Sequence, residues 1–138
     1  MLPESYRLHR RADFSRTVRR GQRTGRRDLV VHAFVHTVDP AVEPTEDVLV
    51  RVGGPRFGLI VSKAVGNAVI RHRVARRLRH ICAELSAEIP VEADIVIRAL
   101  PGAATADPVE LLRQLRSAAR KLGLGEAVRP GVRAGEPV

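Results

Sequence analysis

The chain has 138 residues, of which 44% are hydrophobic but only 3% aromatic, so it suits one domain with an aliphatic core. Its single cysteine, Cys82, excludes an internal disulfide and favours a reducing compartment. No run of about 18 apolar residues is present, so we expect a cytoplasmic protein without a membrane span. The net charge of +9 predicts a polyanionic partner.

The positive charge is concentrated in one part of the chain. Between Val48 and Ala83 there are eight Lys or Arg and no Asp or Glu. This clustering argues against the alternative that the basic residues serve only to keep the protein soluble. A membrane surface fits less well than RNA or DNA, because no basic segment also carries a continuous apolar stripe with aromatic anchors.

The first quarter of the chain predicts one helix and one strand. Residues 1–11 form an irregular basic lead-in, and Asp13–Arg20 is a short helix because its apolar side chains recur four residues apart. Gly21 ends that helix, and Gln22–Asp28 is a basic connection. Leu29–Val38 is rich in β-branched and apolar residues, which predicts a strand.

The middle of the chain predicts further strand segments and a turn. Asp39–Asp47 holds two prolines and is expected to be an exposed loop. Val48–Val52 and Phe57–Ser62 look like strands, either two strands or one strand with a break at Gly53–Pro55. Gly66-Asn67 makes a turn, with Asn67 placed to cap the following helix.

The clearest predicted element is the helix from Ala68 to about Glu88, which Pro90 ends. Apolar residues recur on it at spacings of four, four, three and four, which gives one buried stripe. The stripe consists of Ile70, Val74, Leu78, Ile81 and Leu85. Ala93–Leu100 is then a short aliphatic strand, expected in the interior of the sheet.

The last predicted helix starts at Asp107, a capping residue followed by proline, and runs to Leu122 before Gly123. We expect one domain over residues 1–125 and a disordered tail at 126–138. The fold class is therefore α+β, a single-domain α-β sandwich of order αβββαβα with helices over one sheet.

The long helix carries its charge in two rows beside the apolar stripe. One row is Arg73, Arg77 and His80, and the other is His72, Arg76 and Arg79. Like charges this close repel each other, and a phosphate backbone would neutralise them. An ordinary solvated face would mix Glu among the arginines, and none occurs before Glu84.

The residues just before this helix predict an anion-binding turn. Ser62 and Lys63 supply a hydroxyl and a cation, and Gly66-Asn67 leaves free backbone N–H groups near the helix start. Alone this signal would be weak, because Gly-Asn turns are common. Next to the basic helix it favours binding of nucleic acid phosphates.

The run from Arg56 to Arg79 reads Arg-Phe-Gly-Leu-Ile-Val-Ser-Lys-Ala-Val-Gly-Asn-Ala-Val-Ile-Arg-His-Arg-Val-Ala-Arg-Arg-Leu-Arg. It resembles the signature of the bacterial ribonuclease P protein. The likeness covers most of the chain, because Asp13-Phe14 is similar to the family's first helix and Ala93–Pro101 to its last strand.

This resemblance implies a protein subunit of an endoribonuclease that removes the 5′ leader from precursor tRNA. A catalytic RNA partner holds Mg²⁺ and performs the chemistry, so no catalytic residue, protein-bound metal or cofactor is expected in the protein. The implied partners are the ribonuclease P RNA and precursor tRNA, with one monomeric protein per RNA. The implied fold is like the second domain of ribosomal protein S5, with an uncommon left-handed crossover.

The resemblance also implies two sets of site residues. The RNA-binding set is Ser62, Lys63, Asn67, Arg71, His72, Arg73, Arg76, Arg77 and Arg79. The leader-binding cleft is Phe14, Val18, His32 and Phe34. Three positions depart from the family pattern. His72 replaces an Asn, and Val18 replaces a second aromatic residue of the cleft. His32 replaces a Tyr, and compared with Tyr it stacks less well on bases but can gain charge at low pH.

Three other functions were weighed. A ribosomal-type structural RNA-binding protein remains the main alternative. A self-sufficient nuclease would need clustered carboxylates, whereas the aspartates are scattered and the pair His32 and His36 has no third ligand in view. A helix-turn-helix DNA regulator is disfavoured because a strand precedes the basic helix.

Overall fold

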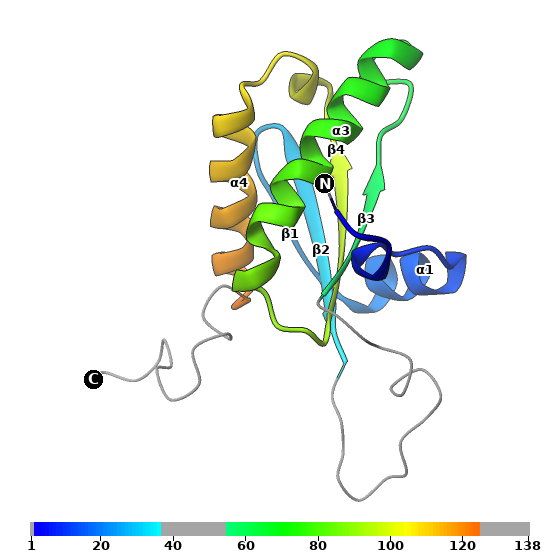
Figure 1. The fold of residues 1–138 in the computed structure, drawn as a ribbon, viewed down its shortest axis with the longest axis vertical. Helices are drawn as coiled ribbons and strands as arrows, with labels where there is room; N and C mark the ends of the chain where they lie inside the picture. The colour runs from blue at the N-terminus through cyan, green and yellow to red at the C-terminus, as the bar shows by residue number, and fades with distance from the viewer. Residues whose placement is uncertain (1, 37–54, 125–138) are drawn as a thin grey trace, which may run out of the picture.

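The computed structural model describes residues 2–36 and 55–124. Within these described ranges, three α-helices, four strands and three short 3₁₀ helices form one α+β unit (Figure 1). In chain order they are α1 (Arg11–Arg20), β1 (Gln22–Gly25), β2 (Leu29–Val35), β3 (Arg56–Ile60), α3 (Ala68–Leu85), β4 (Ala93–Ala99) and α4 (Pro108–Lys121). No helix in the described part is both long and apolar enough to cross a bilayer.

The sheet has the order β1-β2-β4-β3, so β4 is central, as its aliphatic sequence predicted. The pairs β1–β2 and β2–β4 are antiparallel, whereas β3 and β4 are parallel and are connected through α3. In Figure 1, α3 lies in front of the sheet and the chain moves leftward from β3 to β4, with both strands pointing up. This arrangement is the left-handed crossover that the family resemblance implied.

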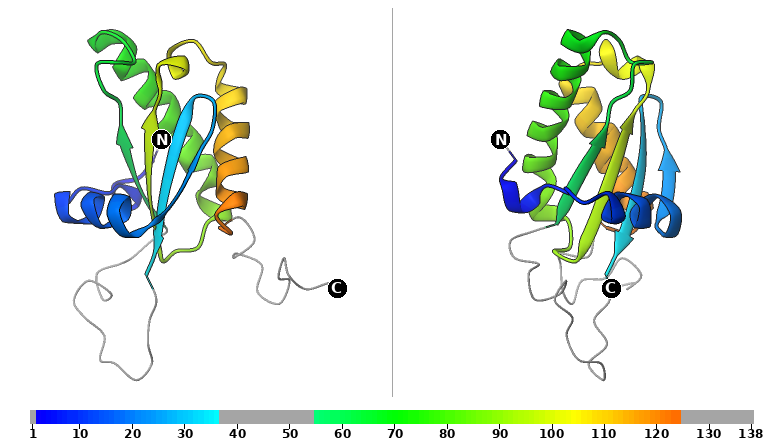
Figure 2. Two further views of the ribbon diagram at one scale, coloured as in Figure 1. Left: turned by 180° about the vertical axis from the view of Figure 1, so that it is seen from behind. Right: turned by 90° about the vertical axis from the view of Figure 1, so that its right-hand side faces the viewer.

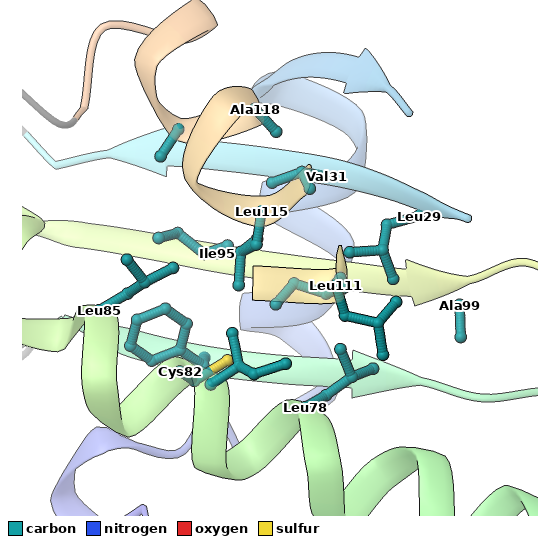
Figure 3. Packing of buried hydrophobic residues seen from close by; sticks show 14 of the residues in the cluster. Leu29, Val31, Leu78, Cys82, Leu85, Ile95, Ala99, Leu111, Leu115 and Ala118 are labelled. Atoms are coloured by element: carbon teal, nitrogen blue, oxygen red, sulfur yellow. The ribbon is translucent and has the colours of Figure 1, made fainter. Parts of the chain in front are cut away.

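The core lies between the sheet and the two helices α3 and α4. Alternate residues of β2 and β4 point to it, because side chains in a strand alternate between faces. The predicted stripe of α3 is confirmed, with Val74, Leu78, Ile81 and Leu85 buried and Ile70 partly buried against the core. Figure 3 shows Leu78, Cys82 and Leu85 of α3 meeting Leu111, Leu115 and Ala118 of α4 over Val31 and Ile95. Burial in this core raises the pKa of the Cys82 thiol, which keeps it protonated and unreactive.

Helix α1 lies on the opposite side of the sheet, across one end of the strands (Figure 2). It begins at Arg11, two residues before the predicted start, and ends before Gly21 as predicted. Its buried side chains include Thr17, whose hydroxyl donates to the Asp13 carbonyl oxygen at 2.9 Å. The sheet face beside α1 carries no other helix among the described residues, and we call it the open face.

Two predicted connections differ from the structure. The lead-in 1–11 was expected to be irregular, whereas its described part includes a 3₁₀ helix at Glu4–Tyr6, and the Leu8 amide donates to the Phe57 carbonyl oxygen at 2.8 Å. Buried Leu2 and Leu8 anchor the segment. The connection Gln22–Asp28 contains β1, an edge strand whose side chains are mostly exposed and therefore show no apolar alternation.

The predicted element order αβββαβα is confirmed, although β1 supplies one of the three leading strands. The proposed strand Val48–Val52 lies outside the described residues, as do the loop Asp39–Asp47 and the tail 126–138. β2 ends at Val35, three residues before the predicted end of that strand. The predicted caps are confirmed at both helices, since the side chains of Asn67 and Asp107 accept from backbone amides of α3 and α4.

Candidate RNA-binding surfaces

The basic residues of α3 and of the turn before it form one surface, which we call the α3 patch. Asn67 Oδ1 accepts from the Ile70 amide at 3.0 Å and starts the helix, while Ser62 Oγ accepts from the Ala64 amide at 3.3 Å and shapes the turn. These two predicted site residues therefore also organise the backbone. The cationic members of the patch are Lys63, Arg71, Arg73, Arg76, Arg77 and Arg79, and His72 lies among them.

No member of the α3 patch forms an ion pair with a carboxylate in the described part of the chain. The first turn of α3 also has no acidic residue, although the positive end of a helix dipole favours one. Arg71 and Arg73 instead place like charges near that end. This arrangement costs stability in the free protein, and a bound polyanion would offset the cost.

The structure distributes the patch over three sides of α3. Arg73 and Arg76 are exposed on the solvent side. Arg77 turns toward the loop before α4 and donates to the Ala106 carbonyl oxygen at 3.4 Å. Arg71 and Arg79 lie on the remaining side, in a groove beside β3. The members of each predicted row lie three or four residues apart on the continuous helix α3 and so share one side of it, although the Arg77 guanidinium is engaged with the Ala106 carbonyl oxygen.

The predicted cleft residues lie around the open face. On β2, His32 and Phe34 alternate with the core residues and so point to this face. On α1, Phe14 and Val18 line a shallow depression together with Arg11, Ser15 and Arg19. Phe34 is partly exposed and meets the ring of His36 edge-on, with the ring centroids 4.9 Å apart.

A buried charge network fixes α1 to the open face. Asp94 of β4 is fully buried and receives two hydrogen bonds from Arg56 of β3, at 3.0 and 2.9 Å. Arg56 also lies 3.5 Å from a carboxylate oxygen of Asp13 on α1. His36 Nε2 lies 2.9 Å from Asp94 Oδ2. Because a buried carboxylate needs such partners, the network sets where α1 can sit.

The Phe14 ring rests directly on the backbone of β3. A Cβ built on Gly58 would lie 2.4 Å from Phe14 Cζ and 2.5 Å from Cε1, so the Phe14 ring would have to move. Gly58 is on the same face as Arg56 because strand side chains alternate. Arg56 and Gly58 together therefore form the seat of Asp13 and Phe14. Within the quoted motif, these two residues position the cleft.

His32 is only 6% exposed, and its Nδ1 is buried without a hydrogen-bond partner. Burial lowers the pKa of His32 below its ordinary 6.5, and the charges of Arg23 and Arg98 lower it further. The imidazole is therefore neutral at physiological pH. The expectation that His32 adds charge at low pH therefore holds only at a pH below its ordinary pKa of 6.5.

The two strand histidines do not build a metal site. His36 is engaged with Asp94, and the described residues contain no group of three or more His, Cys, Asp or Glu that could hold an ion. Arg23 and Arg98, by contrast, were missed as site residues. Side chains alternate along β4, so Arg98 lies on the open face with Val96 and Asp94, and this alternation could have been read from the sequence. Arg23 could be assigned to the open face only if β1 had been recognised as a strand.

Comparison with known proteins identifies the family. The sequence model described as Ribonuclease P matches residues 2–123 of the chain. The chain belongs to the ribonuclease P protein family. It is 72% identical over 132 residues to the ribonuclease P protein component of Nocardia farcinica, covering 90% of this chain and 85% of the relative. It is 45% identical over 122 residues to that of Corynebacterium diphtheriae, covering 88% and 97%.

Solved structures of the family share the fold. The chain matches a mutant ribonuclease P protein of Staphylococcus aureus with a TM-score of 0.70 and 23% identity, covering 88% of this chain and 91% of the other. It matches the Thermotoga maritima ribonuclease P protein with a TM-score of 0.64 and 22% identity, covering 83% and 96%. The chain is an RNA-binding component of the endoribonuclease that matures the 5′ end of tRNA, and it works with the ribonuclease P RNA.

Proposed function

We propose that this ribonuclease P protein uses two separate surfaces for two RNAs. The α3 patch binds the ribonuclease P RNA, and the open face with α1 binds the single-stranded 5′ leader of precursor tRNA. The observation that carries the proposal is that the cations of the α3 patch have no carboxylate partner among residues 2–36 and 55–124. A cation row without carboxylate partners fits a phosphate backbone, because phosphates then replace small counterions that are released.

The open face has the composition of a site for single-stranded RNA. Phe14 and Phe34 offer aromatic faces on which bases stack, and Arg23 and Arg98 supply charge for the phosphates between them. His32, neutral and nearly buried between these arginines, contributes a flat ring surface. Such a surface tolerates many leader sequences, since every base has a stacking face.

The chemistry is assigned to the RNA. In this proposal the ribonuclease P RNA holds Mg²⁺ and activates the attacking water, while the protein adds binding energy and no catalytic group. One monomeric protein joins each RNA in the cytoplasm. The protein then raises cleavage mainly where Mg²⁺ is scarce, because its cations replace some of the charge neutralisation that the metal provides.

The leader surface is tested with substrates that differ only in the leader. Phe14→Ala should weaken binding of the assembled enzyme to leader-bearing precursor tRNA about tenfold, because one stacking contact is lost. The affinity for mature tRNA should not change. Gly58→Ala should act in the same direction, because its Cβ displaces the Phe14 ring. Gly25→Ala is the matched control, since its Cβ would meet nothing within 4 Å.

Equal losses on both substrates would show that α1 does not contact the leader. A ribosomal-type structural role is the alternative to the whole proposal. It predicts that the wild-type protein gives no gain in cleavage at low Mg²⁺ when mixed with ribonuclease P RNA and labelled precursor tRNA, and that it binds ribosomal RNA more tightly.

A further inference from the structure

A groove lies between α3 and the free edge of β3, on the side of α3 away from α4. Its walls are Leu59 and Val61 from the strand side and Ala68, Arg71, His72, Ala75 and Arg79 from the helix side. The volume is about 380 Å³, which is at the small end for a ligand site. Figure 1 shows the two elements that carry these residues, with β3 at the edge of the sheet and α3 over the sheet.

The strand wall offers hydrogen-bonding groups as well as apolar surface. Among the described residues β3 pairs only with β4, and the N-terminal segment meets its outer edge at Phe57 alone. The Leu8 amide donates to the Phe57 carbonyl oxygen, so the main chain of Phe57 faces outward. The two-residue period of a strand places the N–H and C=O of Leu59 on the same outer edge. Leu59 thus presents one donor and one acceptor beside its own side chain.

The helix wall is cationic and incompletely satisfied. Arg71, His72 and Arg79 rim the groove, and no carboxylate lines it. The Nε of Arg71 is buried and has no hydrogen-bond partner. A buried guanidinium N–H without a partner costs free energy that an incoming acceptor would recover. The floor between these cations is small and apolar at Ala68 and Ala75.

We propose that the groove binds one unpaired nucleotide of the RNA that lies on the α3 patch. The base packs against Leu59 and Ala75 and pairs its polar edge with the Leu59 main chain, and its phosphate accepts hydrogen bonds from Arg71 and Arg79. An added peptide strand would use the same main-chain groups, but the two arginines Arg71 and Arg79 on the rim favour a polyanion. This inference rests on the proposed binding of ribonuclease P RNA by the α3 patch.

The first test uses small probes on the full, isotope-labelled chain in NMR titrations. Adenosine 5′-monophosphate should shift the Leu59 and Val61 signals saturably, whereas inorganic phosphate should shift only signals of the arginine side chains. Ala75→Leu, which fills the floor, should abolish the nucleotide effect and keep the phosphate effect. If the nucleotide moves Leu59 no more than phosphate does, or if only an acidic peptide moves it, the proposal is wrong.

The second test measures affinity for the ribonuclease P RNA against salt. Ala75→Leu should weaken binding about tenfold, near the lower end of the cost of one lost base contact, without changing the salt slope. Ala83→Leu is the matched control, because Ala83 is a partly buried alanine of the same helix outside the groove. Ala68→Leu fills the exposed end of the groove and repeats the test if Ala75→Leu lowers the melting temperature.

The outcomes separate the two proposals. If the wild-type chain does not bind ribonuclease P RNA, the proposed function of the α3 patch is wrong. If the wild-type chain binds and both groove variants bind equally well, the nucleotide site is excluded, and the proposed function of the α3 patch is left intact for the arginine variants to test.

Discussion

Helices α3 and α4 pack on the same face of the sheet, and their first turns are built alike. Asn67 caps α3 and Asp107 caps α4, each accepting from a backbone amide at 3.0 Å. Each helix then places an exposed valine at its second residue, Val69 at 72% and Val109 at 73% exposure. Each also buries an aliphatic stripe against β2 or β4.

The two helices differ in what surrounds their arginines. On α4, Arg113 Nε donates to Glu110 at 3.1 Å, and Arg116 donates to Glu88 at 3.0 Å. Glu110 also lies in the first turn and Arg120 in the last, the arrangement that the helix dipole favours. On α3 the arginines have no carboxylate partner among the described residues and gather toward the positive end.

This difference separates arginines that stabilise the protein from arginines that are available to a partner. Counting basic residues would rank the two helices as similar. Ion pairs with carboxylates distinguish the two helices. An exposed ion pair contributes little stability, but its carboxylate already neutralises the arginine that would otherwise bind a phosphate. We therefore assign nucleic acid binding to α3 and expect α4 to make no large electrostatic contribution.

The largest expected effect comes from removing cations of the α3 patch. Arg73→Ala with Arg76→Ala removes two phosphate contacts, each of which contributes about 0.9 to the slope of log affinity against log salt. The slope should fall by about 1.8, and affinity for ribonuclease P RNA at about 0.1 M salt should fall roughly sixtyfold. Filter binding over a salt series measures both quantities.

The matched control is Arg113→Ala with Arg116→Ala on α4. This variant loses the same charge and should keep the salt slope within about 0.5 of the wild type. If both double variants lose affinity equally, net charge alone governs binding, and the comparison between the helices has no functional meaning.

The second effect is on the stability of the free protein. Sulfate should occupy the α3 patch and stabilise the native state, by about 1.4 kcal/mol when its concentration is ten times the dissociation constant. Thermal unfolding in sulfate and in chloride at equal ionic strength measures this gain. The Arg73→Ala, Arg76→Ala variant should lose most of it. An unchanged gain in that variant would assign the effect to general exclusion of sulfate from protein surfaces.

The third effect tests the caps. Asn67→Ala and Asp107→Ala should each lower the free energy of unfolding by about 1 kcal/mol, because each leaves a backbone amide without its side-chain acceptor. Only Asn67→Ala should also weaken RNA binding, since the turn before α3 carries Ser62 and Lys63. Denaturant unfolding and filter binding on the same samples compare the two. Loss of RNA affinity in both variants would point to general destabilisation.

The helices were predictable from sequence because their signals are local. The stripe of α3 repeats within a few residues, and its cap, Asn67, stands directly before it. β1 was missed because an edge strand with the sequence Gln-Arg-Thr-Gly buries little, and only backbone pairing with residues distant in sequence defines it. The lead-in was missed for the same reason, since its order depends on Phe57 and buried Leu8.

The same limit applies to the candidate sites. The α3 patch lies within one continuous segment, so its residues could be named from the sequence. The open face is assembled from four strands and α1, so the roles of Arg23 and Arg98 and the link from Arg56 to Asp94 appear only when the register is known. The sequence analysis gave Arg56 no role beyond being the first residue of the signature run, whereas its contacts with Asp94 and Asp13 show that it holds α1.

The smallest expected effect is a pH dependence of stability that comes from Glu110 on α4. The hydrogen bond from Arg113, assisted by Gln114, lowers the pKa of Glu110 below its ordinary 4.5 in the native state. Near pH 4.5 the unfolded chain therefore binds more protons than the native chain, and stability falls as pH drops toward the native pKa of this carboxyl. Glu110→Gln should flatten that part of the curve, measured by denaturant unfolding between pH 3 and 6. Because Glu110 is exposed the change will be small, and an unaltered curve would show that this pairing does not stabilise α4.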